Sequence, residues 1–208
     1  MKRTPTILAA IALAVLISGC ASARRLPQEE GLHPRLTPFT YIEEGKLVAL
    51  SVDTQCTGLR DKEPFIPLPV AVSNKGLKRL AMTRESFTLV DEAGNRYPLA
   101  TVQEARTLGP IMANDYRVSE YFFDVIATQF HAWTFQSVTL FPVLNATNPL
   151  LGTRRNIVAD NIELAQRMWM TDILYFPHPK GSVKGKKFEL WLSSPDLPDP
   201  VFVKFRVK

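Results

Sequence analysis

The chain has 208 residues, of which 46% are hydrophobic and 22% charged, and its formal net charge is +5. This composition is typical of a folded globular protein and excludes a wholly disordered chain, a collagen and a coiled coil. Two cysteines and three histidines exclude a disulfide scaffold and a zinc site built from several thiolates. Sixteen prolines argue against a bundle of long helices, because each proline removes a backbone donor.

Residues 1–19 have the features of a secretory signal. Two basic residues precede an apolar run over 7–17, which is too short for a typical membrane-spanning helix, and Ser18-Gly19-Cys20 follows. This arrangement resembles the lipobox of bacterial lipoproteins. The resemblance implies that Cys20 becomes the first residue of the mature chain and carries a diacylglycerol and an N-acyl chain. The alternative is an ordinary signal peptide or anchor that contains a cysteine by chance.

The residue after Cys20 bears on the destination of the protein. In Gram-negative sorting, a residue other than aspartate at this position, here Ala21, resembles the outer-membrane class. If the envelope is Gram-negative, we therefore expect a lipid anchor in the outer membrane, facing the periplasm. Removal of residues 1–19 takes away two positive charges, which lowers the net charge from +5 to +3. So small a charge predicts no nucleic-acid partner.

Residues 20–40 lack sustained periodicity and contain three prolines. We expect them to form a flexible tether that spans roughly 25 Å between the lipid and the domain. Within it, Arg24 and Arg25 either contact anionic headgroups or are simply solvated. The remaining residues, 41–208, are enough for one domain with a substantial core.

The alternation of apolar and polar residues that is typical of strands dominates this domain. A hairpin is expected around Asp91–Asn95 with Gly94 in the left-handed region, and Pro98 predicts an edge or bulged strand after it. A Thr101-x-x-Glu104 spacing suits a helical capping box. Residues 160–168 fit either a short helix or the start of a strand. Strands are expected at 48–52, 68–72, 86–90, 96–99, 116–125, 136–142, 169–176, 188–192 and 201–207.

About nine strands with short polar turns predict an all-β fold, an antiparallel β-sandwich with one or two short helices. The runs Val72–Gly76, Glu85–Asp91, Gly94–Pro98, Leu174–Pro177 and Phe188–Leu192 resemble an immunoglobulin-like domain of bacterial lipoproteins, of the DUF4352-like kind. The resemblance covers roughly residues 45–205. It implies an immunoglobulin-like sandwich in the cell envelope and assigns no catalytic residue.

No group of residues predicts catalysis or metal binding. His33, His131 and His178 lie too far apart for a local metal motif, and a site assembled from distant residues is the alternative. We expect Cys56 to be buried and inert, with an intermolecular disulfide or a functional thiol as the alternatives. Asp196 and Asp199 lie in a proline-rich turn, where aspartate commonly accepts backbone hydrogen bonds.

A basic loop at 177–187 is the best candidate for a contact surface. Its lysines suit anionic headgroups, lipopolysaccharide phosphates or teichoic acid, and nearby aromatic residues suit sugar stacking. The alternative is a solvated hairpin tip whose lysines keep a strand edge from pairing. The candidate contact residues are His178, Lys180, Lys184, Lys186, Lys187 and Trp191.

An aromatic cluster occupies residues 116–135. On a strand, the consecutive Tyr121-Phe122-Phe123 would point to both faces, so we expect part of the domain or a partner to cover the outer face. The cluster consists of Tyr116, Tyr121, Phe122, Phe123, Phe130, Trp133 and Phe135.

Together these observations predict a lipid-anchored envelope protein that binds rather than catalyses. The leading hypothesis is an accessory or adaptor module for another envelope protein. The alternative is a binding module for cell-wall glycan or an anionic envelope polymer, and a small envelope enzyme is a third hypothesis. No cofactor is expected beyond the lipid on Cys20. An adaptor requires an exposed apolar patch or an unpaired edge, and a glycan binder requires two aromatic side chains along one groove.

Overall fold

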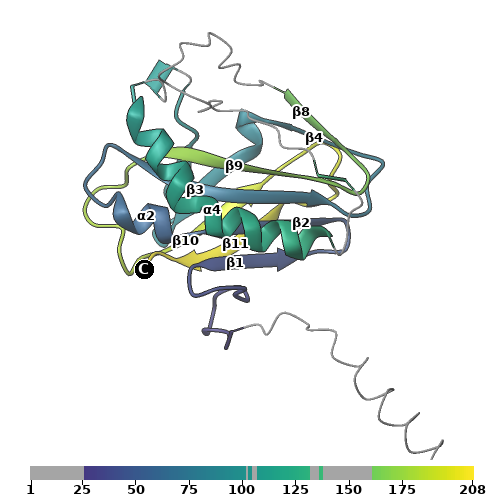
Figure 1. Cartoon of the computed structure of the whole chain (residues 1–208), viewed down its shortest axis with the longest axis horizontal. Coiled ribbons are helices and arrows are strands. Elements are labelled where there is room, and N and C mark those ends of the chain that lie inside the picture. Colours follow the sequence, from purple (N-terminus) through teal and green to yellow (C-terminus); the bar gives the residue numbers. More distant parts are fainter. Residues whose placement is uncertain (1–25, 102, 105–106, 132–135, 138–160) are drawn as a thin grey trace, which may run out of the picture.

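The computed structural model describes residues 26–101, 103–104, 107–131, 136–137 and 161–208 (Figure 1). Two α-helices, α2 (Gln55–Leu59) and α4 (Pro110–His131), and one 3-10 helix, η1 (Arg84–Ser86), occur among eleven strands in this part of the chain. The strands are β1 (Thr40–Glu44), β2 (Val48–Asp53), β3 (Phe65–Asn74), β4 (Arg79–Thr83), β5 (Phe87–Asp91), β6 (Arg96–Pro98), β7 (Gln136–Ser137), β8 (Asn161–Ala165), β9 (Met168–Pro177), β10 (Lys187–Leu192) and β11 (Val201–Arg206).

The strands form two main sheets and a ribbon. One sheet has the order β1-β2-β3-β9-β7, with every pair antiparallel except β7 and β9. The second sheet has the order β11-β10-β5-β6 and is antiparallel throughout. Strands β4 and β8 pair with each other. In Figure 1 the second sheet, with its yellow strands, lies behind the first. The predicted all-β sandwich is confirmed.

Period-two alternation places the core between the sheets. On β10, Phe188, Leu190 and Leu192 are buried while the residues between them are partly exposed. Strand β2 is buried along its whole length, because Leu50 faces the main core and Ala49 belongs to a second apolar cluster beneath α4. The alternation read from the sequence therefore holds for the sheet that is open on one side and disappears where both faces are covered.

The strand predicted at 116–125 is wrong, because these residues belong to α4. Its 22 residues also exceed the short helices expected from the sequence. Consecutive aromatic residues favour strands, but the buried positions recur every three or four residues, as on one helix face. Those positions are Met112, Asp115, Ser119, Phe122, Ile126 and Phe130.

Because Tyr121-Phe122-Phe123 lie on helix α4, they do not point to two opposite faces of a strand. Phe122 and Phe130 are buried against Ala49, Ala71 and Trp169, so the helix covers the outer face of the five-stranded sheet. Tyr121 points outward and is 64% exposed. Of the predicted cluster, Trp133 and Phe135 lie outside the described residues, as does 138–142 of the strand expected over 136–142.

Several local predictions are confirmed. Gly94 has φ +84° in the turn between β5 and β6, and Pro98 ends β6 at the edge of its sheet. The Thr101 hydroxyl accepts from the Glu104 N–H, and the Glu104 carboxylate accepts from the Thr101 N–H, which completes the capping box. Residues 161–165 form strand β8, so the strand alternative for 160–168 holds.

Residues 26–39, which we call the strap, are packed against the domain, and this part of the predicted tether is therefore not free. Leu32 is buried in the main core, and Leu26 and Tyr41 each form a bridge with Arg35. Thr37 donates to Thr40, which donates to buried Asp53 on β2. Figure 1 shows the strap, in purple, running along β1.

The strap closes one side of the sandwich. Strands β1 and β11 are the edges of the two sheets. The Ile42 N–H on β1 donates to the Pro34 carbonyl, and the His33 N–H donates to the Lys204 carbonyl on β11. The strap thus satisfies backbone groups of both edge strands, which would otherwise be open to pairing with another chain.

Candidate functional site

The outer face of the second sheet carries a row of rings. On β10 and β11, Trp191 lies opposite Phe202, and their rings stack with centroids 4.6 Å apart. The His33 ring from the strap meets Phe202 edge-on at 5.3 Å. All three residues are only partly buried. This aromatic row therefore presents part of its apolar area to solvent.

Glu189 joins the aromatic row to a positive charge. One of its oxygens accepts from Trp191 Nε1 at 3.0 Å, and the other lies 2.8 Å from Lys204 Nζ. Partial burial acts to raise the pKa of Glu189, but the hydrogen bonds from Lys204 and Trp191 outweigh it and lower the pKa. The carboxylate is thus ionised at neutral pH and holds the indole in place.

Besides its contact with the Phe202 ring, His33 is fixed by two polar contacts, although it lies in the predicted tether, where nothing rigid was expected to position it. Its Nδ1 accepts from the Lys204 N–H at 2.8 Å, and its Nε2 lies 3.2 Å from a Glu43 oxygen. Burial lowers the pKa of His33 and outweighs the opposing effect of Glu43. A neutral imidazole suits these contacts, because Nδ1 then accepts while Nε2 donates.

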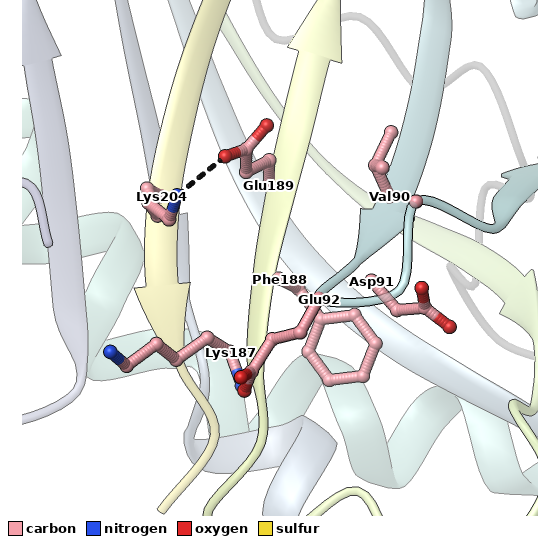
Figure 2. Close-up of a pocket in the computed structure, with 8 residues that line it drawn as sticks. Val90, Asp91, Glu92, Lys187, Phe188, Glu189 and Lys204 are labelled. Atoms are coloured by element: carbon pink, nitrogen blue, oxygen red, sulfur yellow. Dashed lines mark hydrogen bonds and ion pairs between the residues drawn. The ribbon is translucent and has the colours of Figure 1, made fainter. Parts of the chain in front are cut away.

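A shallow groove of about 410 Å³ adjoins the aromatic row (Figure 2). Charged side chains of both signs line it: the positive ones are Lys187 and Lys204, and the negative ones are Asp91, Glu92 and Glu189. Figure 2 shows the ion pair between Lys204 and Glu189 bridging β11 and β10. Neither Trp191 nor Phe202 lines this groove.

The structure divides the predicted contact loop. Lys180, Lys184 and Lys186 are exposed, and Lys186 Nζ donates to the Lys180 carbonyl. His178 is partly buried, with its Nδ1 2.5 Å from the Pro179 carbonyl. Lys187 and Trp191 instead lie on β10, where Trp191 belongs to the aromatic row. The six residues therefore do not form one surface.

Two carboxylates hold the loops in place. Asp61 accepts from the Ser182 hydroxyl at 2.7 Å and from the Val183 N–H at 2.5 Å, which ties the 177–187 loop to the segment after α2. Asp196 accepts from the Ala81 N–H at 2.7 Å, as expected of an aspartate in a turn. These loops are thus held by carboxylate–backbone contacts.

A buried polar cluster lies between α2, α4 and β9. Asp115 accepts from Arg60 Nε and Nη2 at 2.8 and 2.7 Å, and its other oxygen accepts from the Tyr175 hydroxyl at 3.1 Å. Cys56 is buried beside this cluster, and desolvation, followed by the charge of Asp115, raises its pKa. A thiol with a raised pKa is a poor nucleophile, which agrees with the predicted inert cysteine.

Asp172 is a second buried carboxyl group. One oxygen accepts from the Tyr116 hydroxyl at 3.1 Å, while the other has no hydrogen-bond partner in the described part of the chain. Burial raises the pKa of Asp172 to about 7. The alternation of apolar and polar residues does not reveal that Asp172 is buried. It is a charged residue at a core-facing position of β9, next to the buried Ile173 and Leu174.

Phe202, Glu189 and Glu43 were not singled out in the sequence. The signal for Phe202 was its position between Val201 and Val203, which places an aromatic ring on the charged face of the last strand. His131 is the last residue of α4. Cys20 lies outside the described residues. Among the residues that the structure describes, no cluster has metal-ligating geometry, and no helix is long and apolar enough to cross a membrane.

Comparisons with known proteins add little. No family model and no curated protein matches the chain, so the resemblance to the DUF4352-like domain gains no support from a family match. A solved structure described as a "putative lipoprotein (ycdA)" from Bacillus subtilis is similar, with 15% sequence identity and a TM-score of 0.40. The match covers 80% of this chain and 38% of that one, so the chain spans well under half of its neighbour. A likeness at this level carries no functional information.

Proposed function

We propose that this protein is a lipid-anchored binding module of the bacterial cell envelope, without catalytic activity, that engages another envelope protein. Cys20 carries the lipid, and the outer membrane facing the periplasm is the proposed location. The contact surface is the outer face of β10 and β11, and the observation that carries the proposal is the stacked, partly buried pair Trp191 and Phe202 on that face. This assignment replaces the 177–187 loop as the centre of the contact surface.

The chemistry of this face suits a protein partner. Tryptophan is among the residues that contribute most to protein interfaces, especially where the surrounding contacts exclude water. Here Trp191 is held by Glu189, and the charges of Glu189 and Lys204 lie within the same face. A partner that covers the rings would bury apolar surface. The charges of both signs in the adjoining groove could pair with opposite charges on the partner and so fix its alignment.

Glycan binding is the second candidate, because a partly exposed tryptophan also stacks on sugar rings. Two observations make it the weaker one. Trp191 and Phe202 stack on each other, so they do not present two separate ring faces to a sugar. The groove beside them is lined by neither ring. A glycan site is expected to combine aromatic and polar groups in one cleft.

Site-specific photocrosslinking in cells tests the proposal. A photoreactive residue in place of Thr88, which pairs with Trp191 across β5 and β10, should capture one envelope protein. Trp191→Ala should reduce the captured amount about tenfold, as expected when a hot-spot side chain is removed. The same photoreactive residue at Tyr121, which is exposed on α4, serves as the control and should capture far less.

Three outcomes would count against this reading. Equal capture from positions 88 and 121 would mean that the face has no special role. Capture of wall glycan alone would favour the second candidate. Capture that is unchanged in Cys20→Ser would show that the lipid anchor does not bring the protein to its partner. A thermal melt of Trp191→Ala verifies that the variant is folded.

A further inference from the structure

We propose that the domain stands on an anionic membrane surface through the side of the sandwich closed by the strap, with the aromatic row beside the membrane rather than against it. The proposal rests on the lipid anchor at Cys20 and adds an orientation and a second lipid contact. Three observations carry it, namely the length of chain outside the structure, the point where the strap begins, and the charges at that point.

The chain between the lipid and the folded domain is short. The described residues begin at Leu26, which forms a bridge with Arg35 within the strap. Residues 21–25 alone separate Leu26 from Cys20. Six residue steps reach at most about 20 Å when fully extended, which is less than the width of the domain. The start of the strap must therefore lie close to the headgroups.

Positive charge surrounds this starting point. Glu29 of the strap forms ion pairs with Arg35 at 3.1 Å, with Arg206 at 3.3 Å and with Lys208 at 3.9 Å. One carboxylate is thus shared among three cations, and we call these four residues the basic end. The side chains of Arg206 and Lys208 are 39% and 34% exposed, so they are available to a second anion.

An anionic lipid headgroup fits the basic end. Juxtamembrane cations near a lipid anchor are attracted to the negative surface potential, and one lipid group together with a basic patch is a common two-part anchor. Arg24 and Arg25 add two positive charges in the connecting residues. The carboxylates of Glu29 and of exposed Glu30 are opposing charges on the strap.

This orientation leaves the proposed binding face free. The strap runs along β1 and β11, the edges of the two sheets, so both sheets stand on edge above the membrane. In Figure 1 the strap lies below β1, with α4 in front of the sheets and the yellow strands behind. Neither the helix nor the aromatic row is then covered by lipid.

Fluorescence quenching by a headgroup-attached nitroxide tests the orientation. The lipidated full-length protein is reconstituted in vesicles of phosphatidylethanolamine and phosphatidylglycerol, with a fluorophore on Glu30→Cys or on Arg96→Cys. Arg96 lies on β6, three strands from β11, a separation of roughly 14 Å. The label at position 30 should be quenched severalfold more strongly, while buried Cys56 stays unlabelled. Equal quenching at the two positions would overturn the proposed orientation.

The charge contribution has its own test. Arg206→Gln with Lys208→Gln should reduce quenching at position 30, and so should replacing phosphatidylglycerol with phosphatidylcholine. Lys180→Gln with Lys184→Gln is the matched control, because these exposed lysines belong to the 177–187 loop. Unchanged quenching in the first pair would overturn the role of the basic end. Failure of the protein to float with the vesicles would instead overturn the lipid anchor, and with it the proposal.

Discussion

Replacing Asp115 with alanine is expected to lower the free energy of unfolding by about 3–5 kcal/mol, the range seen when one partner of a buried ion pair is removed. Asp115 is 1% exposed and accepts from Arg60 and Tyr175. Its loss would leave the Tyr175 hydroxyl without its acceptor and the Arg60 guanidinium with only its longer contacts to the Ile111 carbonyl and Glu63. It would also remove the ion pair that joins Arg60, at the C-terminal end of α2, to α4.

Urea-induced unfolding followed by tryptophan fluorescence measures this loss. Asp115→Asn keeps the shape and one acceptor, so its cost should lie between those of the wild type and Asp115→Ala. Arg60→Ala combined with Asp115→Ala should cost less than the sum of the two single changes, since the cycle isolates their interaction. Additive effects would show that the contact between Arg60 and Asp115 contributes nothing of its own.

The second large effect concerns pH and Asp172. Burial raises the pKa of this carboxyl group to about 7 in the folded protein, from its ordinary value of 3.8. The folded state therefore binds more protons than the unfolded state between these values, and stability falls as the pH rises through this window. A pKa shift of about three units corresponds to a decrease of about 4 kcal/mol in the free energy of unfolding over the whole window. About 2–3 kcal/mol of this decrease is expected between about pH 5 and pH 8.

Asp172→Asn should remove this pH dependence, because asparagine resembles the protonated carboxyl group and still accepts from Tyr116. The variant should then be more stable than the wild type at about pH 8, with a smaller difference at about pH 5. Asp199→Asn, at an exposed position, is the control and should follow the wild type. Parallel stability curves for the wild type and Asp172→Asn would contradict the raised pKa. Urea denaturation across the pH range provides the curves.

The strands were predictable because the alternation of apolar and polar residues along each strand agrees with which side chains are buried and which are exposed in the fold. On β11, Val203 and Phe205 face the core while Lys204 and Arg206 face outward, so the period of two is visible in the residues themselves. The turn at Asp91–Asn95 was equally clear, because Gly94 adopts a positive φ that few other residues tolerate.

Helix α4 was missed for a physical reason. Its buried face includes Asp115 and Ser119, polar residues that interrupt the apolar spacing of three and four. Their burial is stabilised by partners that are distant in sequence, such as Arg60 and Tyr175, or by the helix backbone in the case of Ser119. Without those partners in view, the run Tyr121-Phe122-Phe123 favoured a strand.

The candidate site was only partly predictable. Trp191 was named from the sequence, but as part of a basic loop from which the structure separates it. Its neighbours Phe202 and His33 come from β11 and the strap, and only the pairing of β10 with β11 brings them together. Register across strands depends on packing of the whole sandwich, which local patterns do not contain.

The sequence by itself determined the all-β class of the domain, the position of most strands and the turns between them, because these depend on residues close together in the chain. It also predicts the lipid anchor at Cys20. The tertiary structure alone decided that 110–131 is a helix, that 26–39 is a strap closing two sheet edges, and that one sheet face carries the aromatic row. Each of these depends on burial by residues far apart in sequence, and burial outweighs local preference wherever the two conflict.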